Sequence, residues 1–282
     1  MLRAVLVSLA LAGAPAIAFA QTSAEQAPQE AETLEALAAE ALLLNGFDVL
    51  TEDVARSFGT AGEDTRAQNP RMAEAWDRLG PRYFRAQDLF DGAVATLAEA
   101  ATREELEGLR DFFASALGEK VTALETASQT PEMDAVDKPE LGRAILAEIE
   151  EGDPRLAALE RLGSAFGSAE GAAAVSLNIR FAFLSALGAQ NGQGMSEGDL
   201  LALVMSGRDQ LIADIQRDEL ARHAFVYSSL TAEEIGAYAD LLETPAGQKL
   251  YDAVNLAIEV LLVRQIRAFG KDLGEALRAE NI

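Results

Sequence analysis

The sequence predicts an all-α protein, and three observations lead to this fold class. Alanine, leucine and glutamate, which all favour helices, are abundant throughout the chain. No stretch alternates β-branched with polar residues, as a half-buried strand would. Only eight prolines occur in 282 residues, and most of them stand at predicted helix boundaries. We therefore expect helices joined by short turns.

Residues 1–20 have the features of a secretory signal peptide. Arg3 supplies a positive charge, residues 4–13 form an apolar segment too short to span a bilayer, and Ala-Phe-Ala at 18–20 is a typical cleavage site. We expect cleavage after Ala20 and a periplasmic location, with an uncleaved membrane anchor as the alternative. The next segment is polar and lacks an apolar period, so we expect a disordered linker over residues 21–31.

Composition narrows the chemistry that the protein can perform. The chain has no cysteine, which excludes disulfides, thiolate nucleophiles and iron–sulfur clusters. Its 46 acidic and 23 basic residues give a net charge of -23, which repels nucleic acid and anionic lipid. We therefore expect no nucleic-acid partner and no stable membrane insertion after signal cleavage.

A sequence pattern for two capped helices joined by a short turn first occurs at 101–121. Thr102 is placed to cap a helix, and Glu105, three residues later, can reach back to its backbone amide in a capping box. Ser115 can cap a second helix that follows at once. Gly118 falls in the first turn of that helix, where the missing side chain would let two helices cross closely.

The same pattern occurs again at 230–250. Thr231 and Glu234 form the second capping box, and Thr244 precedes Pro245 at the start of the following helix. Gly247 occupies the position that Gly118 has in the first copy.

The two copies share six identical residues over the twenty positions that begin at Thr102 and Thr231, without a gap. Upstream, residues 43–50 resemble residues 176–184 weakly. We therefore predict two related helical halves, each ending in a capped helical hairpin, packed on a shared core. The predicted repeats cover residues 32–137 and 138–282.

The second copy resembles an exported bacterial family that is known only as domain of unknown function 2059. The resemblance rests on an aromatic residue, a Thr-x-Glu-Glu-apolar segment, and a Pro-x-Gly-x-Lys segment. It implies an exported helical protein and implies no activity. The matching positions are Tyr227, Leu230, Thr231, Glu233, Glu234, Ile235, Thr244, Pro245, Gly247 and Lys249.

Four polar side chains remain as candidates for binding. Lys120 and Lys249 occupy matching positions of the two copies, and we expect each to form a salt bridge within its own hairpin, with an acidic ligand as the alternative. Arg180 lies among apolar residues, so we expect a partly buried ion pair or an anion site. His223, the only histidine, follows Glu219 by one helical turn. We expect a surface ion pair there, with acid–base or metal chemistry as the alternative.

These patterns favour a non-catalytic binding or interaction module of the cell envelope. A helical protein with a pocket for a small or lipid-like ligand is the alternative, and a hydrolase comes third. We predict no catalytic residue, no metal and no cofactor, because no P-loop, metal-ligand or nucleophile motif is present. The apolar segment 257–263 of the C-terminal helix is a candidate interface for a homo-oligomer or another partner, such as an envelope protein.

Overall fold

The computed structural model describes residues 32–188 and 195–279, and the residues from Glu32 on form one compact unit. The predicted signal peptide (1–20) and linker (21–31) lie outside the described residues. Within the described residues every regular element is a helix, so the prediction of an all-α protein is confirmed.

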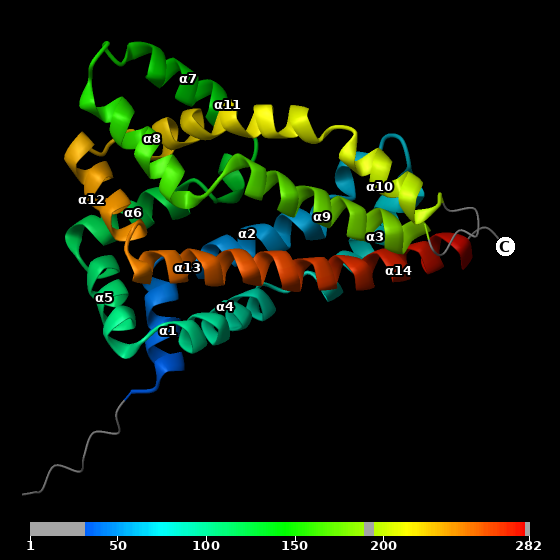
Figure 1. Cartoon of the computed structure of the whole chain (residues 1–282). Helices are drawn as coiled ribbons and strands as arrows, with labels where there is room; N and C mark the ends of the chain where they lie inside the picture. Colours follow the sequence, from blue (N-terminus) through cyan, green and yellow to red (C-terminus); the bar gives the residue numbers. More distant parts are fainter. Residues whose placement is uncertain (1–31, 189–194, 280–282) are drawn as a thin grey trace, which may run out of the picture. The chain divides into compact units, whose positions relative to one another are not determined.

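The first seven α-helices are joined by short turns and two 3-10 helices, Glu63–Thr65 and Pro131–Met133 (Figure 1). They are α1 (Leu34–Leu44), α2 (Phe47–Thr60), α3 (Pro70–Tyr83), α4 (Ala86–Ala100), α5 (Arg103–Phe113), α6 (Ala116–Ala127) and α7 (Lys138–Glu148).

The remaining helices include one change of helix type. The segment Ala257–Leu262 is a π-helix, and it continues directly from α13 into α14. The α-helices are α8 (Pro154–Phe166), α9 (Ala169–Gly188), α10 (Glu197–Met205), α11 (Arg208–Val226), α12 (Ala232–Leu242), α13 (Pro245–Leu256) and α14 (Val263–Ala279).

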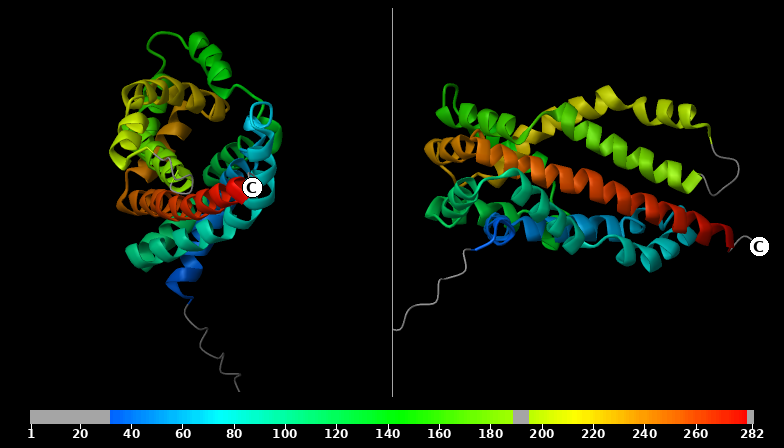
Figure 2. Two further views of the ribbon diagram at one scale, coloured as in Figure 1. Left: turned by 90° about the vertical axis from the view of Figure 1, so that its right-hand side faces the viewer. Right: turned by 60° about the horizontal axis from the view of Figure 1, so that its bottom comes forward.

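The continuous rod of α13, the π-helix and α14 lies between two groups of helices (Figure 2). Helices α2, α3 and α4 lie on one side of it, and α9, α10 and α11 lie on the other. The π-helix approaches α4 closely at Gly92, where an added Cβ would lie 2.2 Å from Leu261 Cδ1. Sequence periodicity predicted an ordinary α-helix here, because a π-turn leaves no distinct pattern of apolar residues.

The two copies of the repeated pattern fold into two hairpins with matching boundaries. We call α5 with α6 the first hairpin and α12 with α13 the second hairpin. Each helix of the second hairpin begins and ends 129 residues after its counterpart, as Arg103 and Ala232 illustrate. The residues before those two helices, Thr102 and Thr231, each form a complete capping box with the glutamate three positions later.

The turns of the two hairpins also match. Ser115 and Thr244 cap α6 and α13, and their hydroxyls accept hydrogen bonds from the amides of Gly118 and Gly247 at 3.1 and 3.0 Å. An added Cβ would lie 2.1 Å from Phe112 O at Gly118 and 2.2 Å from Leu241 O at Gly247. The predicted close approach is therefore confirmed, and it is made to the backbone of the preceding helix of the same hairpin.

The two repeated lysines bind across the hairpins, so the prediction of a bridge within each hairpin was wrong. Lys120 of the first hairpin contacts Glu234 of the second at 2.9 Å, and Lys249 of the second contacts Glu105 of the first at 2.7 Å. Each glutamate also completes a capping box. The exchange is reciprocal, because each hairpin gives one lysine and one glutamate to the other.

Apolar residues of both hairpins are buried in one cluster, together with residues of α1, α4 and α8. The hairpins therefore pack on a shared core. The matching buried positions are Leu106, Leu109 and Phe113 in the first hairpin and Ile235, Tyr238 and Leu242 in the second.

The repeat is not confirmed beyond the hairpins. Residues 43–50 span a turn between two helices, in which Gly46 has a φ of +79°, whereas residues 176–184 lie inside the single helix α9. The weak sequence likeness of these two segments therefore does not reflect equivalent structure. The boundary between the predicted repeats 32–137 and 138–282 stays a prediction.

Candidate functional site

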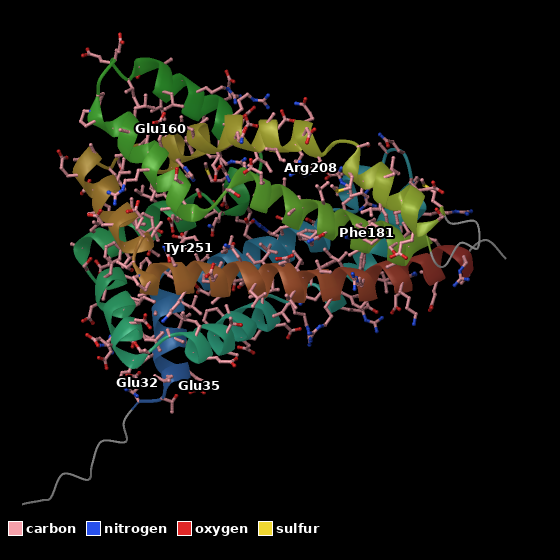
Figure 3. The ribbon with its side chains drawn as sticks, in the orientation of Figure 1. Glu32, Glu35, Glu160, Phe181, Arg208 and Tyr251 are labelled. Atoms are coloured by element: carbon pink, nitrogen blue, oxygen red, sulfur yellow. The ribbon has the colours of Figure 1, made fainter. Side chains whose placement is uncertain are left out.

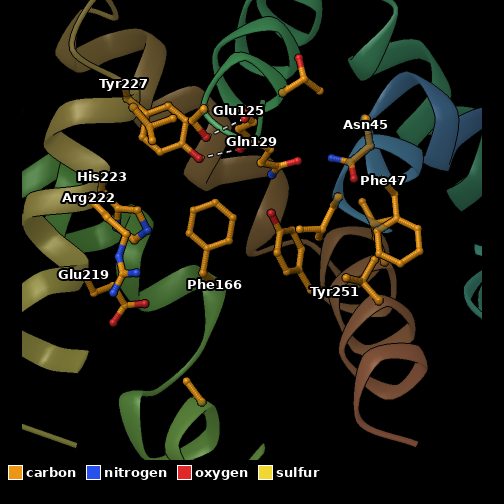
Figure 4. Close-up of a pocket in the computed structure, with 18 of the residues that line it drawn as sticks. Asn45, Phe47, Glu125, Gln129, Phe166, Glu219, Arg222, His223, Tyr227 and Tyr251 are labelled. Carbon is orange, nitrogen blue, oxygen red and sulfur yellow. Dashed lines mark hydrogen bonds between the residues drawn. The ribbon is translucent and has the colours of Figure 1, made fainter. Parts of the chain in front are cut away.

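A cavity of about 500 Å³, partly open to solvent, lies between α6, α9, α11 and α13 (Figure 4). The turn between α1 and α2 closes one side of it. The Thr122 hydroxyl on α6 holds this turn by donating to the carbonyl oxygen of Leu44 at 2.8 Å. Gly46 in the turn has no side chain, and an added Cβ would lie 2.6 Å from Thr126 Cγ2. The α1–α2 turn can therefore approach α6 closely enough to form a wall.

Apolar and aromatic side chains form most of the cavity, with polar groups at selected places. Figure 3 locates Tyr251 among the side chains between α13 and the helices α8 and α9. The lining residues that the following paragraphs use are Phe47, Glu125, Ser128, Gln129, Phe166, Ala172, Ser176, Glu219, Arg222, His223, Tyr227, Tyr251 and Val254.

One carboxylate inside the cavity receives two tyrosine hydroxyls. Tyr227 donates to Glu125 Oε1 at 2.6 Å, and Tyr238 donates to the same oxygen at 3.0 Å. The Tyr238 hydroxyl lies 3.2 Å from the Tyr251 hydroxyl, which extends the network to α13. Four elements thus contribute one residue each: α6, the end of α11, α12 and α13. We call these four residues the Glu125–tyrosine cluster.

The end of α11 is held in position for this contact. Tyr227 is the C-terminal capping residue of α11, and its ring is buried. Arg155, near the start of α8, donates to the carbonyl oxygen of Tyr227 at 3.2 Å and also to that of Ser228. The guanidinium thereby fixes the backbone from which the Tyr227 hydroxyl reaches Glu125.

Burial controls the ionisation of the Glu125–tyrosine cluster. Loss of contact with water raises the pKa of Glu125 to about 7, and the hydrogen bonds from Tyr227 and Tyr238 oppose this rise without cancelling it. Burial, followed by the nearby Glu125 charge, raises the pKa values of Tyr227, Tyr238 and Tyr251. Near neutral pH the glutamate therefore exists in both protonation states, while the tyrosines remain donors.

His223 also lines the cavity, where it packs against aromatic rings. Its ring centroid lies 5.3 Å from that of Phe166, and its Nδ1 is buried without a hydrogen-bond partner. Burial, followed by the charge of Arg222, lowers the pKa of His223 to about 4. The predicted surface ion pair with Glu219 was wrong, because the neutral imidazole is half-buried and forms no salt bridge among the described residues.

Two serine hydroxyls and the Gln129 amide also belong to the polar lining. Ser128 donates to the carbonyl oxygen of Glu125 at 2.7 Å, and Ser176 donates to that of Ala172 at 3.0 Å. The side-chain oxygen of Gln129, by contrast, is buried without a donor. Both serines are thus engaged with helix backbone, while an acceptor of Gln129 remains available.

The structure places Arg180 outside this site, on the exposed surface of α9. Within the described part of the chain it forms no ion pair. The expectation of a partly buried guanidinium was therefore wrong. Ile179 and Phe181, its apolar neighbours, lie on other faces of the same helix and are half-buried, so a helical residue between them can still point to solvent.

Among the described residues, no three histidine, aspartate or glutamate side chains gather as metal ligands. The absence of a metal, of a cofactor and of a catalytic residue stays a prediction. Of the four binding candidates from the sequence, His223 alone lines the cavity, together with Glu219 and Tyr227, which the sequence analysis named for other reasons. The repeated residues Thr102, Glu105, Gly118, Lys120, Thr231, Glu234, Pro245, Gly247 and Lys249 build and join the hairpins instead.

The Glu125–tyrosine cluster was not identified from sequence, although an internal signal existed. With the offset of 129 residues, Glu125 of α6 corresponds to Val254 of α13, an apolar position in the other copy. A carboxylate in one copy at a position that is apolar in the other copy indicates a departure from the pattern that the two hairpins share. Tyr238, which corresponds to Leu109, shows the same departure.

Among the described helices, α9 alone is long and apolar enough to cross a membrane by length and composition. Four of its residues, Ala169, Ala173, Leu177 and Ala182, are buried against neighbouring helices. The prediction that the protein has no stable membrane insertion remains a prediction.

Comparison of the chain with protein-family models, with curated proteins and with solved structures gave no match. The resemblance of residues 227–250 to domain of unknown function 2059 therefore depends on the quoted motif alone.

Proposed function

We propose that this protein is an exported, non-catalytic binding protein that holds a small organic molecule in the cavity between α6, α9, α11 and α13. The observation that supports this most directly is the cavity itself. Its volume of about 500 Å³ is within the range of ligand pockets, and its lining combines aromatic walls with a few polar groups. A molecule with an apolar body and one polar end fits this lining.

The polar groups favour binding over hydrolysis. A serine hydrolase needs a hydroxyl that is hydrogen-bonded to its base. Ser128 and Ser176 donate to backbone carbonyl oxygens instead, and the lowered pKa makes His223 a weak base. Glu125 is already held by two tyrosines. These contacts suit recognition of a polar group on a bound molecule.

The proposed location is the periplasm, and it depends on the signal peptide predicted at 1–20 with cleavage after Ala20. The resemblance to an exported family supports the same proposal. An exported chain without cysteine must be stabilised by burial alone, and the shared core of the two hairpins provides such burial.

Two exposed alanines of α9, two positions apart and therefore on nearly opposite faces of the helix, allow a direct test of the cavity. Ala172 lines the cavity and Ala174 does not, and both residues are exposed, so each can accept a large side chain without disturbing the core. A library of small organic molecules would be screened by thermal shift, and the ligands found would be titrated against Ala172→Trp and Ala174→Trp.

The proposal predicts that Ala172→Trp weakens binding of these ligands at least tenfold, because the indole occupies the cavity entrance, and that Ala174→Trp leaves binding unchanged. Ligands that bind both variants equally well would contradict the proposal.

A second candidate, an interaction module for an envelope protein or for another copy of the chain, has its own supporting observation. Helix α10 exposes Leu201 and Leu203 to about half of their maximum, and Leu256 and Val260 are exposed near the π-helix. Exposed apolar side chains favour protein contacts when they are contiguous. We rank this candidate second, because no described contact identifies what would cover these side chains.

A further inference from the structure

We infer that the ligand of this cavity is an organic cation, namely an amine with an apolar body, whose ammonium group pairs with the carboxylate of Glu125. The inference rests on the proposed function and specifies the class of molecule that the cavity binds. Three features of the described residues lead to it: the distribution of charge, the unused acceptors and the aromatic walls.

Charge around the cavity favours a cation. Glu125 and Glu219 are the acidic lining residues, and Arg222 is the basic one. Arg222 is exposed on α11, and its charge acts on His223 and Glu219 rather than on Glu125. On the chain as a whole, a net charge of -23 attracts cations toward the protein.

Two cations contact the chain just after Glu125 through backbone oxygens. Lys138 donates to the backbone oxygen of Ser128 at 2.5 Å, and Arg56 donates to that of Gln129 at 3.3 Å. Neither side chain is among the cavity lining. Both cations are therefore committed to the chain that follows α6, and the Glu125 carboxylate has no cationic partner among the described residues.

Two acceptors in the cavity lack donors. Both tyrosine hydrogen bonds reach Oε1 of Glu125, and none of the described residues donates to its Oε2. The side-chain oxygen of Gln129 is buried without a partner. A ligand that brings several N–H donors satisfies both oxygens, because an ammonium group has up to three donors and no acceptor.

Aromatic rings stand on several sides of the same space (Figure 4). Phe166 lies between His223 and Tyr251, with ring centroids 5.3 and 5.0 Å from theirs, and Tyr227 lies beside Glu125. The faces of such rings attract ammonium groups, and a carboxylate among aromatic rings is a favourable site for an organic cation. An apolar ligand body would contact the same rings and Phe47.

Binding of a cation should be coupled to the proton on Glu125. Burial raises the pKa of Glu125 to about 7, so an ammonium group must displace the proton from a glutamic acid at low pH and meets a carboxylate at higher pH. If the carboxylate form alone binds the cation, the affinity rises about tenfold from pH 6 to pH 8. The other titratable groups around Glu125 are Tyr227, Tyr238 and Tyr251, from α11, α12 and α13, and His223 and Glu219, both from α11.

Three probes of similar shape and different charge test the inference by isothermal titration calorimetry. They are 4-phenylbutylamine, 4-phenylbutan-1-ol and 4-phenylbutyrate, measured at pH 6 and pH 8. We expect the amine to bind at least tenfold more tightly than the alcohol at pH 8 and to lose about tenfold in affinity at pH 6. Glu125→Gln should remove both differences, and Glu119→Gln, an exposed change on the same helix, should remove neither.

The outcomes separate this inference from the proposed function. Equal affinities for the amine and the alcohol, or tightest binding of the butyrate, would overturn the cation while the cavity remained a binding site. Failure of all three probes to bind would also overturn the cation inference. The library screen against Ala172→Trp and Ala174→Trp then decides the proposed function separately.

Discussion

The two hairpins share a common frame, meaning their helix lengths, caps and turn glycines, and they differ in the side chains near the cavity. Both have a capping box before the first helix, a hydroxyl cap and a glycine at the turn, and helices of equal length. Along α6 and α13 the residues toward the cavity differ. Glu125 in the first hairpin corresponds to Val254 in the second, and the lining residue Tyr251 corresponds to Thr122, which is not part of the lining.

This difference separates positions that maintain the fold from positions that form the site. Repeated residues make contacts that any copy of the hairpin requires, such as caps, the close turn and the lysine–glutamate exchange. Residues of the Glu125–tyrosine cluster are not repeated, and they converge on one carboxylate. We conclude that likeness between the copies indicates folding, and that unlike residues at equivalent positions indicate where to look for binding.

The largest effect that tests the common frame should come from the turn glycines. Gly118→Ala and Gly247→Ala each place a methyl group about 2 Å from a backbone oxygen of the preceding helix, a contact that the turn cannot relieve by a side-chain rotation. Each change should lower the free energy of unfolding by about 3 kcal/mol or more, measured by urea denaturation.

Each hairpin provides its own control for this experiment. Gly108 in α5 and Gly236 in α12 have no atom within 4 Å of an added Cβ, so alanine there should stabilise the protein by about 0.5–1 kcal/mol through helix propensity. If the turn glycines tolerated alanine as well as these two positions do, the close approach would not be a requirement of the hairpin.

The frame could be predicted from the sequence because its signals are local. A capping box depends on residues three positions apart, as with Thr102 and Glu105, and the apolar spacing of a helix lies within one segment. The partners of Lys120 and Lys249 could not be predicted, since they depend on how the hairpins cross. Residue spacing within one helix contains no information about that crossing.

The cavity was hidden from sequence analysis for a similar reason. Glu125 lies on a helix that has one other glutamate, Glu119, and nothing local distinguishes Glu125 from that exposed residue. Its burial arises because Tyr227 and Tyr238, more than 100 residues away, meet it in the folded chain. The prediction for Arg180 was wrong in the opposite sense, because its apolar neighbours in the sequence did not bury its side chain.

The next prediction tests Glu125, the acidic residue of α6 that corresponds to the apolar Val254 of α13. The folded protein favours protonated Glu125, so this residue contributes stability below pH 4.5 that is lost as the pH rises through about 7. Glu125→Gln, which can still accept the tyrosine hydrogen bonds, should therefore stabilise the protein at pH 8 by up to about 3 kcal/mol relative to the native chain and much less at pH 4.5.

His223 provides the opposing control within the same cavity. The folded protein favours the neutral imidazole, so its contribution is present above pH 6.5 and is lost as the pH falls through about 4. Between pH 4.5 and 6.5, a rise in pH changes the contributions of Glu125 and His223 to the free energy of unfolding in opposite directions. In that range the stability of Glu125→Gln should rise with pH, and that of His223→Asn should fall. Parallel curves for the two variants and the native chain would show that neither group titrates as its burial requires.

The smallest effects should come from the lysine–glutamate exchange, where the two hairpins are alike but not equally exposed. Lys249 and Glu105 have side-chain exposures of 32% and 21%, against 40% and 32% for Lys120 and Glu234. Lys249→Met should therefore lower the Tm more than Lys120→Met, and both losses should shrink in 1 M salt because screening weakens partly exposed pairs. Both shifts should remain well below those of the turn glycines.

Changing the glutamates to glutamine isolates the charge, because glutamine at the third helical position can still complete a capping box. Glu105→Gln should reproduce the Tm loss of Lys249→Met, and the double variant should lose little more, since either change removes the same pair. The hydrogen bond from Lys249 lowers the pKa of Glu105 to about 2, so this contribution is present above pH 4.5 and disappears as the pH falls toward 2. Additive losses in the double variant would mean that each residue acts within its own hairpin, and that the reciprocal exchange does not hold the two copies together.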